Sequence, residues 1–368
     1  MPTERASFAD RRARAAAKLR ERSIAALLVT PGADLLYLTG YQMFPTERLT
    51  CLVVARDGAA TLVCPELEAP RAAHAAPDLG RVTWGETDDP FSVVATLVRG
   101  DGAIALADQM WAAFVLRLEA ALPNREFRVA SELTRELRMR KDASEREALR
   151  LASESADRAY VRVLDEPFAG RAEREIGEAL AHALRDEGHD EVGFTIVASG
   201  PNGASPHHET GDRRIAPGDT VVLDFGGAMD GYRSDISRTV HVGRDVDLEQ
   251  RRVHEVVRRA QQAGYAAAKE GATAESVDAA SRAVIEEAGY GKFFIHRTGH
   301  GIGLDGHEHP YLVRGNRERL EPGMAFSIEP GVYLPGRFGV RIEDVAIIDD
   351  DGSVRPLNRA DHAFAVVG

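Results

Sequence analysis

The stretch of residues 217–240 holds two acids where a β-sheet would reject them. Its apolar, β-branched arms flank the turn signal Ala-Met-Asp-Gly, so it is predicted to form a β-hairpin. With the turn centred between Met229 and Asp230, Asp224 faces Asp235 directly across the ladder. Like charges in opposed positions destabilise an antiparallel pair, and a cation between the two carboxylates would remove that penalty.

A second predicted hairpin, residues 322–348, repeats the arrangement. With a turn around Gly336, Glu329 faces Glu343, and the first acid follows the opening Pro-Gly at the same distance as in the first hairpin. An internal repeat with two acids in each copy indicates a bound ligand. Two divalent cations would neutralise the four carboxylates, and oxygen-rich ligation of two neighbouring ions is typical of two-metal hydrolases. The alternative is four exposed acids on a solvated face with no metal.

A glycine-rich loop with histidines precedes each predicted hairpin. Six of the 12 histidines lie in these loops, namely His207, His208, His296, His300, His307 and His309. The glycines around His300 oppose a helix, so we expect an extended segment in which His300 approaches a metal and supplies one nitrogen ligand.

The remaining histidines of these loops are not expected to bind metal. We expect His207, His296 and His307 to donate hydrogen bonds to a developing oxyanion or to hold the substrate, with a merely structural role as the alternative. His208 and His309 are expected to be bystanders.

Two more side chains flank the acids of the second hairpin. Arg341 lies two residues before Glu343 and therefore on the same strand face. It is expected to fix a metal-bound carboxylate or to capture a substrate carboxylate, and a simple ion pair is the alternative. Tyr333 occupies an equivalent position after Glu329.

The elements that carry these residues occur twice along the chain, in the order helix, helix, strand, loop, hairpin. The predicted helices and strands are 144–164, 172–187 and 192–199 in the first copy, and 247–270, 274–288 and 292–295 in the second. A capping-box spacing, Ser144 to Glu147, is predicted to start the first helix. We expect the two copies to pack as one sheet backed by helices, with the four acids at a pseudo-twofold centre.

The chain before these copies has its own organisation. Strands alternating with helices predict an α/β domain over residues 1–130, joined through a connection at 131–143 to an α+β domain at 144–368. Cys51 and Cys64 are expected to lie opposite each other on a hairpin that turns at Asp57-Gly58, as two buried thiols, with a cross-strand disulfide as the alternative.

Composition excludes several classes of partner. The net charge of −12 opposes a nucleic-acid partner, and no apolar run is long enough to cross a membrane. The first residues lack the apolar segment of a signal peptide, so a cytoplasmic location is expected.

The motifs of residues 199–345 resemble those of the pita-bread metallopeptidases, in the Xaa-Pro branch that contains prolidase and aminopeptidase P. The matching pieces are S-G-P-N, L-D-F-G, S-D-I-S-R-T, H-R-T-G-H-G-I-G-L, S-I-E-P-G and V-R-I-E-D. Residues 1–130 resemble the creatinase-type N-terminal domain in pattern only. One departure is Gly306, which stands before His307 where the family more often has a β-branched residue.

The resemblance implies a role for each matching residue. Five would ligate two metal ions: Asp235 and Glu343 would bridge both ions, Asp224 would bind one, and His300 and Glu329 the other. A metal-bridging hydroxide would be the nucleophile and Glu329 would shuttle its proton. His207 and His307 would stabilise the tetrahedral intermediate, while His296, supported by Arg341, would shape the proline side of the site, with Tyr333 nearby.

The same resemblance implies two Mn²⁺ ions, with Co²⁺ or Zn²⁺ as alternatives, a homodimer, and small peptide substrates with proline in the second position. The expected activity is hydrolysis of Xaa-Pro bonds. An Xaa-Pro dipeptidase is slightly favoured over an Xaa-Pro aminopeptidase because the chain is compact. A catalytically dead binding protein of the same fold is the alternative outside the enzymes, and the complete set of five candidate ligands argues against it.

Overall fold

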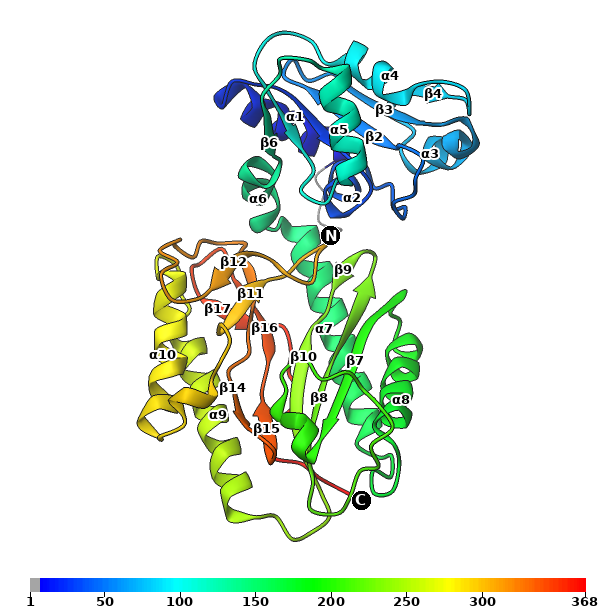
Figure 1. Ribbon diagram of the computed structural model, residues 1–368. Helices are drawn as coiled ribbons and strands as arrows, with labels where there is room; N and C mark the ends of the chain where they lie inside the picture. The colour runs from blue at the N-terminus through cyan, green and yellow to red at the C-terminus, as the bar shows by residue number, and fades with distance from the viewer. Residues whose placement is uncertain (1–6) are drawn as a thin grey trace. The chain divides into compact units, whose positions relative to one another are not determined.

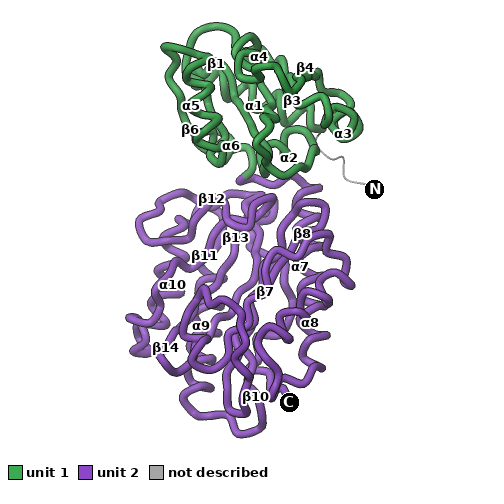
Figure 2. Tube along the Cα trace, turned by 45° about the vertical axis from the view of Figure 1, so that its right-hand side comes forward, with its two compact units in different colours: residues 1–138 green, residues 139–368 purple. Residues whose placement is uncertain are grey.

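The computed structural model describes residues 7–368, and the chain forms two compact units, Met1–Arg138 and Met139–Gly368 (Figure 2). The division between them falls inside the segment that the sequence predicts as a connection, residues 131–143. Among the described residues, no helix combines the length and the apolar character needed to cross a bilayer.

The first unit is built on a six-stranded sheet with the order β4-β3-β2-β1-β5-β6. Its strands are β1 (Ile24–Val29), β2 (Cys51–Ala55), β3 (Ala60–Pro65), β4 (Gly80–Trp84), β5 (Ala103–Leu106) and β6 (Phe127–Val129). Its helices are α1 (Phe8–Glu21), α2 (Ala33–Thr39), α3 (Ala69–Ala75), α4 (Pro90–Leu97), α5 (Ala112–Ala121) and α6 (Ser131–Met139), with a short 3₁₀ turn, η1 (Glu66–Glu68). The unit therefore has the α/β character that the sequence predicts.

The core of this unit lies between the sheet and two of its helices. Ala26 and Leu28 of β1 share a buried cluster with Phe91 of α4 and Leu118 of α5. Alternate residues of a strand point to opposite faces, so this apolar face of β1 is the one that the two helices cover.

The two cysteines do not face each other, contrary to the predicted pairing. Cys51 lies opposite Val63, and both thiols are buried and free. Gly58, with φ of 98°, closes a three-residue loop in which Ala55 donates to the carbonyl of Ala59, so the ladder begins one position earlier than expected. A shift of one residue sends the two side chains to opposite faces of the sheet.

The second unit begins with two helices and a five-stranded sheet. These elements are α7 (Ala143–Val163), α8 (Glu173–Asp186), β7 (Glu191–Ser199), η2 (Gly200–Ala204), β8 (Thr220–Met229), β9 (Tyr232–Arg233), β10 (Ile236–Val242) and β18 (Val366–Val367). Tyr160 of α7 and Leu180 of α8 pack into one cluster with Val197 and Leu223 of the sheet. Asp142 caps α7 through the backbone amides of Ser144 and Glu145, so the predicted start at Ser144 is wrong by two residues.

The following elements repeat this order (Figure 1). They are α9 (Leu248–Ala267), α10 (Ala274–Glu287), η3 (Gly291–Phe293), β11 (Gly299–Gly301), β12 (Glu308–Leu312), β13 (Ala325–Ile328), β14 (Gly331–Leu334), β15 (Phe338–Arg341), β16 (Asp344–Ile348) and β17 (Val354–Pro356). Strands β12-β11-β13-β16-β17 form a second five-stranded sheet, and β14 pairs with β15. The predicted strand at 292–295 is wrong, because residues 291–293 form a 3₁₀ turn.

The two halves of the second unit meet along a seam rather than in the single continuous sheet that was expected. An isolated bridge pairs Ser237 with Glu343, and the Thr239 hydroxyl both accepts from the Arg341 amide and donates to its carbonyl, each at 3.0 Å. The predicted acids lie along this seam, so the fold brings the ends of both hairpins together. The architecture is an α/β unit followed by an α+β unit with an internal repeat, as the sequence predicts.

Candidate metal centre

Strand ends supply most of the acidic groups of the site. Asp224 lies within β8, and Asp235 lies in the short gap between β9 and β10. Glu329 follows the last residue of β13, and Glu343 directly precedes β16. His300 is the central residue of β11, in the extended conformation that its flanking glycines predict.

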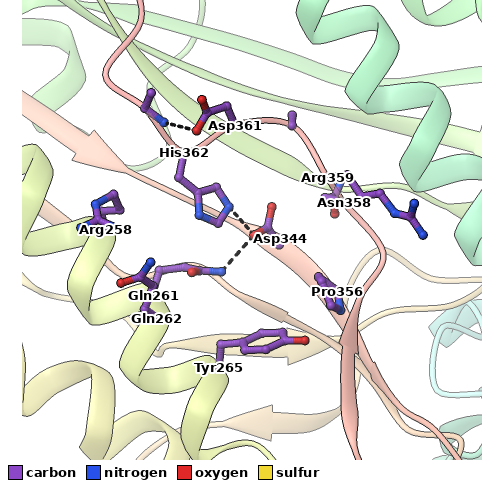
Figure 3. A pocket seen from close by; sticks show the side chains of 12 residues that line it. Arg258, Gln261, Gln262, Tyr265, Asp344, Pro356, Asn358, Arg359, Asp361 and His362 are labelled. Atoms are coloured by element: carbon purple, nitrogen blue, oxygen red, sulfur yellow. Dashed lines mark hydrogen bonds and ion pairs between the residues drawn. The ribbon is translucent and has the colours of Figure 1, made fainter.

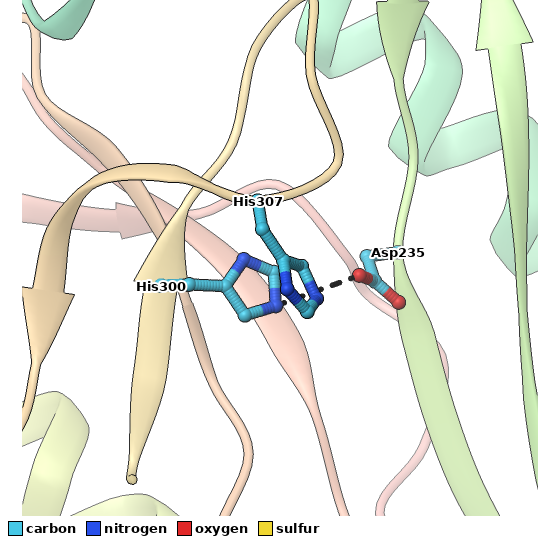
Figure 4. Close-up of side chains that lie close together, drawn as sticks. All are labelled: Asp235, His300 and His307. Carbon is cyan, nitrogen blue, oxygen red and sulfur yellow. Dashed lines mark ion pairs between the residues drawn. The ribbon is translucent and has the colours of Figure 1, made fainter. Parts of the chain in front are cut away.

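Three groups of side chains bring ligand atoms within 4.8 Å of one another. The groups are Asp224, Asp235 and Glu343; His300, Glu329 and Glu343; and Asp235, His300 and His307, the last of which is drawn in Figure 4. Asp235, His300 and Glu343 each belong to two groups. Side chains shared in this way could hold two cations side by side.

The first hairpin reaches this arrangement with a register different from the predicted one. Its turn is Asp230-Gly231, both with positive φ, and Asp224 lies opposite Ser237 rather than Asp235. A two-residue loop with positive φ at both positions is the type I′ hairpin turn that Asp-Gly favours. Asp235 is therefore a diagonal neighbour of Asp224, and its carboxylate still reaches the same centre.

The second hairpin keeps the predicted register. Ile328 lies opposite Asp344 in one ladder and Gly331 lies opposite Arg341 in the next, so Glu329 and Glu343 stand at matching positions between the two ladders. Both acids lie outside the regular strands there, and Glu343 forms a bridge with Ser237 across the seam.

Ser237 links the two hairpins and was not singled out from the sequence. Its hydroxyl lies 3.0 Å from Oδ1 of Asp224 and 2.7 Å from Oε2 of Glu343, and it accepts from Nε of Arg341 at 2.8 Å. With the correct hairpin register the sequence would have indicated Ser237, because this residue lies opposite Asp224 in the ladder.

Arg341 is buried and is directed at Asp224 rather than at the nearer acid in the sequence, Glu343. Besides this ion pair, it donates to the Tyr333 hydroxyl at 3.0 Å and to the Pro206 carbonyl at 3.3 Å. Burial disfavours the guanidinium charge, but the Asp224 carboxylate and its neighbours outweigh burial and raise the pKa of Arg341. Each of the three nitrogens of this guanidinium therefore has a partner within the protein.

The buried acids hold their protons strongly in the absence of a cation. Burial raises the pKa of Asp224, and it raises the pKa of Asp235 and of Glu343 well above the ordinary range, with the charges of neighbouring carboxylates adding to the rise for all three. Oε1 of Glu343 is buried and makes no hydrogen bond. A bound cation would supply the positive charge that this cluster lacks.

Glu329 and His300 form a pair at the edge of the cluster. Nε2 of His300 lies 3.2 Å from Oε1 of Glu329 and 3.8 Å from Oδ2 of Asp235. Burial opposes ionisation of Glu329, but the hydrogen bond and the charge of His300 outweigh it and lower the pKa of Glu329 to about 2. Nδ1 of His300 lies 3.1 Å from the carbonyl of Gly301, which fixes the ring with Nε2 toward the acids, as is usual for a metal-ligating histidine.

His296 and Tyr333 continue the network from Arg341. Nδ1 of His296 donates to the Arg297 carbonyl at 2.7 Å, so Nε2 is left to accept from the Tyr333 hydroxyl at 2.8 Å. Burial lowers the pKa of His296, which agrees with a neutral ring. The structure therefore joins Asp224, Arg341, Tyr333 and His296 in one chain of contacts.

The ring of His307 lies against that of His300, with centroids 3.8 Å apart and the two planes tilted by 38°. Burial, followed by the charges of His300 and Arg297, lowers the pKa of His307 to about 4, so the ring is neutral near pH 7. Nη2 of Arg297 lies 3.1 Å from Nδ1 of His307. A guanidinium only donates, so Nδ1 accepts and Nε2 carries the proton.

A cavity of about 480 Å³ contains these groups. Its lining consists of Phe194, Ile196, Pro206, His207, Asp224, Asp235, His296, Arg297, His300, His307, Glu329, Arg341 and Glu343. The sequence analysis singled out neither the apolar residues of this lining, Phe194, Ile196 and Pro206, nor Arg297. His208 and His309 are outside this lining: His208 lies 2.8 Å from the Glu173 carboxylate, and His309 contacts the ring of Tyr311.

A second cavity, of about 600 Å³, is lined by Asp344, the residue that follows Glu343 (Figure 3). At its base Asp344 accepts from His362 at 2.5 Å and from Gln261 at 3.0 Å. Arg238 binds the same carboxylate at 2.7 Å and also donates to the Glu343 carbonyl at 2.6 Å. This network fixes the backbone that presents Glu343 to the first cavity.

The donor set fits two divalent cations. It combines several carboxylates with one imidazole, a mixture that suits hard or borderline ions, and the unpartnered Oε1 of Glu343 gives a direct place for a ligand bond. Arg341 and Ser237 orient the Asp224 and Glu343 carboxylates, as the residues behind metal ligands commonly do.

Comparison with known proteins assigns this architecture to a class. Residues 146–350 match metallopeptidase family M24, and residues 11–140 match the creatinase/prolidase N-terminal domain. The chain therefore belongs to metallopeptidase family M24, with a creatinase-type N-terminal domain followed by a pita-bread domain. The family and the fold predicted from the sequence are confirmed.

Individual relatives span nearly the whole chain. A probable dipeptidase PepE of Mycobacterium tuberculosis is 46% identical over 98% of this chain and 96% of its own length, and an Xaa-Pro dipeptidase of Lactobacillus helveticus is 39% identical over 86% and 88%. Among solved structures, prolidase from Thermococcus sibiricus matches with a TM-score of 0.94 at 36% identity, over 99% of this chain and 100% of that one.

Proposed function

We propose that the protein hydrolyses the Xaa-Pro bond of dipeptides with the help of two divalent cations. The observation that carries the proposal is the overlap of the three ligand groups, in which Asp235, His300 and Glu343 are each shared. Relatives named Xaa-Pro dipeptidase, such as that of Lactobacillus helveticus, support the choice of substrate. An Xaa-Pro aminopeptidase is the alternative within the same family.

Five residues would hold the cations: Asp224, Asp235, His300, Glu329 and Glu343. Mn²⁺ is the proposed metal, because one imidazole among many carboxylates suits it well, and Co²⁺ or Zn²⁺ could take the same ligands. When bound, the cations supply Lewis-acid activation of water and of the peptide carbonyl.

Other side chains would bind the substrate and move protons. Glu329 is the proposed carrier of the proton from the attacking water to the leaving imino group. The neutral His307, with its proton on Nε2, can donate to the developing oxyanion, and His207 is proposed to do the same from the opposite loop. His296 is proposed to contact the proline, held in place by Tyr333. Arg341 would hold Asp224 in position.

The activity test is direct. Purified protein, stripped with a chelator and then reloaded with Mn²⁺, should release proline from Ala-Pro, and the stripped protein should not. Asp235→Asn should abolish the activity, whereas Asp350→Asn, which changes an exposed acid, should retain it. Failure of the reloaded protein to cleave Ala-Pro or any longer Xaa-Pro peptide would refute the proposal.

We further propose a cytoplasmic homodimer, which light scattering and cell fractionation can test.

A further inference from the structure

Two arginines line the cavity of the metal centre, and they differ in their partners. Arg341 is buried, and its guanidinium is used by Asp224, Ser237, Tyr333 and the Pro206 carbonyl. These contacts use four of its five N–H donors, so it cannot bind a substrate carboxylate through two hydrogen bonds without giving up one of them. Arg297 is the other arginine of the lining, and it is only half-buried.

Arg297 is held in place without a counter-ion. Its guanidinium carbon lies 4.4 Å from the centroid of the Tyr311 ring, and Nη2 donates to Nδ1 of His307 at 3.1 Å. Within residues 7–368 no carboxylate lies at ion-pair distance from it, although most arginines of the second unit have such a partner. One nitrogen contact leaves most of the five N–H donors of a guanidinium available.

Arg297 adjoins the proposed centre through a single histidine. Arg297 contacts His307, and the His307 ring in turn lies against that of the candidate ligand His300, with centroids 3.8 Å apart. The guanidinium therefore lies one imidazole beyond the candidate ligands. In a dipeptide the free carboxylate lies one residue beyond the scissile carbonyl, and one residue spans about 3.5 Å.

The charges in the cavity also favour Arg297 as the group that binds a free carboxylate. Two divalent cations would neutralise the carboxylates of the proposed reaction site, and Arg341 is already paired with Asp224. Arg297, which no carboxylate neutralises within residues 7–368, is therefore the cation of the cavity available to a free substrate carboxylate. A planar guanidinium held on an aromatic ring can bind a carboxylate through two parallel hydrogen bonds. A substrate that continues beyond proline presents a neutral peptide group at this place instead.

We propose that Arg297 binds the free α-carboxylate of the substrate and makes the enzyme selective for dipeptides over longer peptides, an inference that rests on the proposed Xaa-Pro hydrolysis. His307 and Tyr311 position its guanidinium. Arg297 is thus a specificity-determining residue, and the chemistry that it recognises is a carboxylate at the end of the second residue.

The test compares substrates that differ only in this charge. Rates are measured for the Mn²⁺-loaded protein with Ala-Pro, with its C-terminal amide Ala-Pro-NH₂, and with the tripeptide Ala-Pro-Ala. The variants are Arg297→Met, which removes the charge, and Arg297→Lys, which keeps a charge without the planar fork. Arg317→Met is the matched control, because that side chain is 88% exposed and lies outside the cavity.

Arg297→Met should lower kcat with Ala-Pro and with the amide to the same extent, because the donor to His307 is lost with both substrates. It should in addition raise KM for Ala-Pro alone, so that kcat/KM falls about 10- to 100-fold more for Ala-Pro than for the amide, because the charge-assisted pair with the carboxylate is lost with that substrate only. Arg297→Lys should recover part of the loss, and Arg317→Met should match the parent protein with all three substrates. The parent protein should prefer Ala-Pro to both other substrates, and Arg297→Met should erase that preference.

Other outcomes separate the two proposals. Equal losses with Ala-Pro and its amide would overturn the role of Arg297 and leave Xaa-Pro hydrolysis standing, as would a parent protein that cleaves all three substrates alike. If the parent protein cleaves none of them, the proposed function fails. In that case calorimetric titration with proline and with prolinamide still tests Arg297. If Arg297→Met binds proline more weakly than the parent protein does but binds prolinamide equally well, the carboxylate contact is supported. If the change affects neither ligand, or both alike, the contact is overturned.

Discussion

At the scale of single residues, the site contains more buried negative charge than its own cations balance. Arg341 and Ser237 satisfy part of it through Asp224 and Glu343. Oε1 of Glu343 remains buried without a hydrogen bond, and a buried unpartnered acceptor normally costs stability. The local arrangement therefore favours metal binding over stability of the metal-free chain.

Glu343→Gln should separate these two effects. It replaces a buried carboxyl group, whose raised pKa makes it costly either to ionise or to protonate at neutral pH, with a neutral amide. The free energy of unfolding of the chelator-treated protein should therefore rise by about 1–3 kcal/mol. The same change removes a shared carboxylate, so calorimetric titration should show Mn²⁺ binding weakened by at least about 100-fold. Asp350→Asn, which alters an exposed acid paired with Arg146, should change neither quantity measurably. A metal-free Glu343→Gln protein less stable than its parent in urea would contradict this account of the cluster.

His254 gives the second unit a defined dependence of stability on pH. It is buried on α9, stacks on Phe364 with centroids 4.5 Å apart, and burial lowers its pKa to about 4. The unfolded chain takes up a proton as the pH falls through about 6.5, and the folded chain does so only near pH 4. The stability that the neutral ring contributes is therefore complete above pH 6.5 and is lost as the pH falls to 4.

The expected loss from this residue is about 3 kcal/mol over that range. It can be measured as the difference in the pH slope of urea unfolding between the parent protein and His254→Gln, both without metal. Other groups titrate equally in the two proteins, so they cancel in the difference. Parallel pH profiles would show that His254 does not carry this dependence.

At the scale of elements, sequence patterns located the hairpins, but a single turn decided which residues face each other. Asp230-Gly231 forms a two-residue loop, and this moves the partner of Asp224 from Asp235 to Ser237. In the second hairpin Gly336 lies at the centre of the turn, and the predicted register holds. The type I′ preference of Asp-Gly was the available signal in the first case.

Long-range contacts could not be predicted in this way. Arg297 and Tyr311 are separated by β11 in the sequence and meet only because β11 pairs with β12. The ion pair between Arg341 and Asp224 depends on the seam between the two halves of the second unit. Periodicity and turn residues report neighbours along the chain and across one ladder, and they carry no information about how two sheets meet.

Helix α7 offers a test of local structure that is independent of the site. The Asp142 carboxylate accepts from the amides of Ser144 and Glu145, each at 2.9 Å, and Glu145 accepts from the Asp142 amide. Asp142→Ala should lower the free energy of unfolding by about 1 kcal/mol. Ser144→Ala leaves these cap bonds in place and should cost less than about 0.5 kcal/mol. Equal effects of both changes in urea unfolding would assign the cap to Ser144 instead.

At the scale of the whole molecule, each unit has a core of its own. Residues such as Leu28 and Phe91 fill the core of the first unit, and separate clusters that include Leu223 and Phe326 fill the second. The candidate ligands all belong to the second unit. Metal binding should therefore stabilise that unit directly, because a ligand that binds only the folded state shifts its unfolding equilibrium.

Calorimetric melting of the protein with Mn²⁺ and with a chelator should resolve this difference. At a free Mn²⁺ concentration about 1,000 times its Kd, the second unit should gain about 4 kcal/mol, which raises the Tm of a domain of this size by about 10 °C. The transition of the first unit should stay where it is, because none of the candidate ligands lies in it. Glu343→Gln should lose most of the shift. A metal-induced shift of equal size in both transitions would show that the two units unfold as one cooperative body, and the separation of their cores would then not extend to their stability.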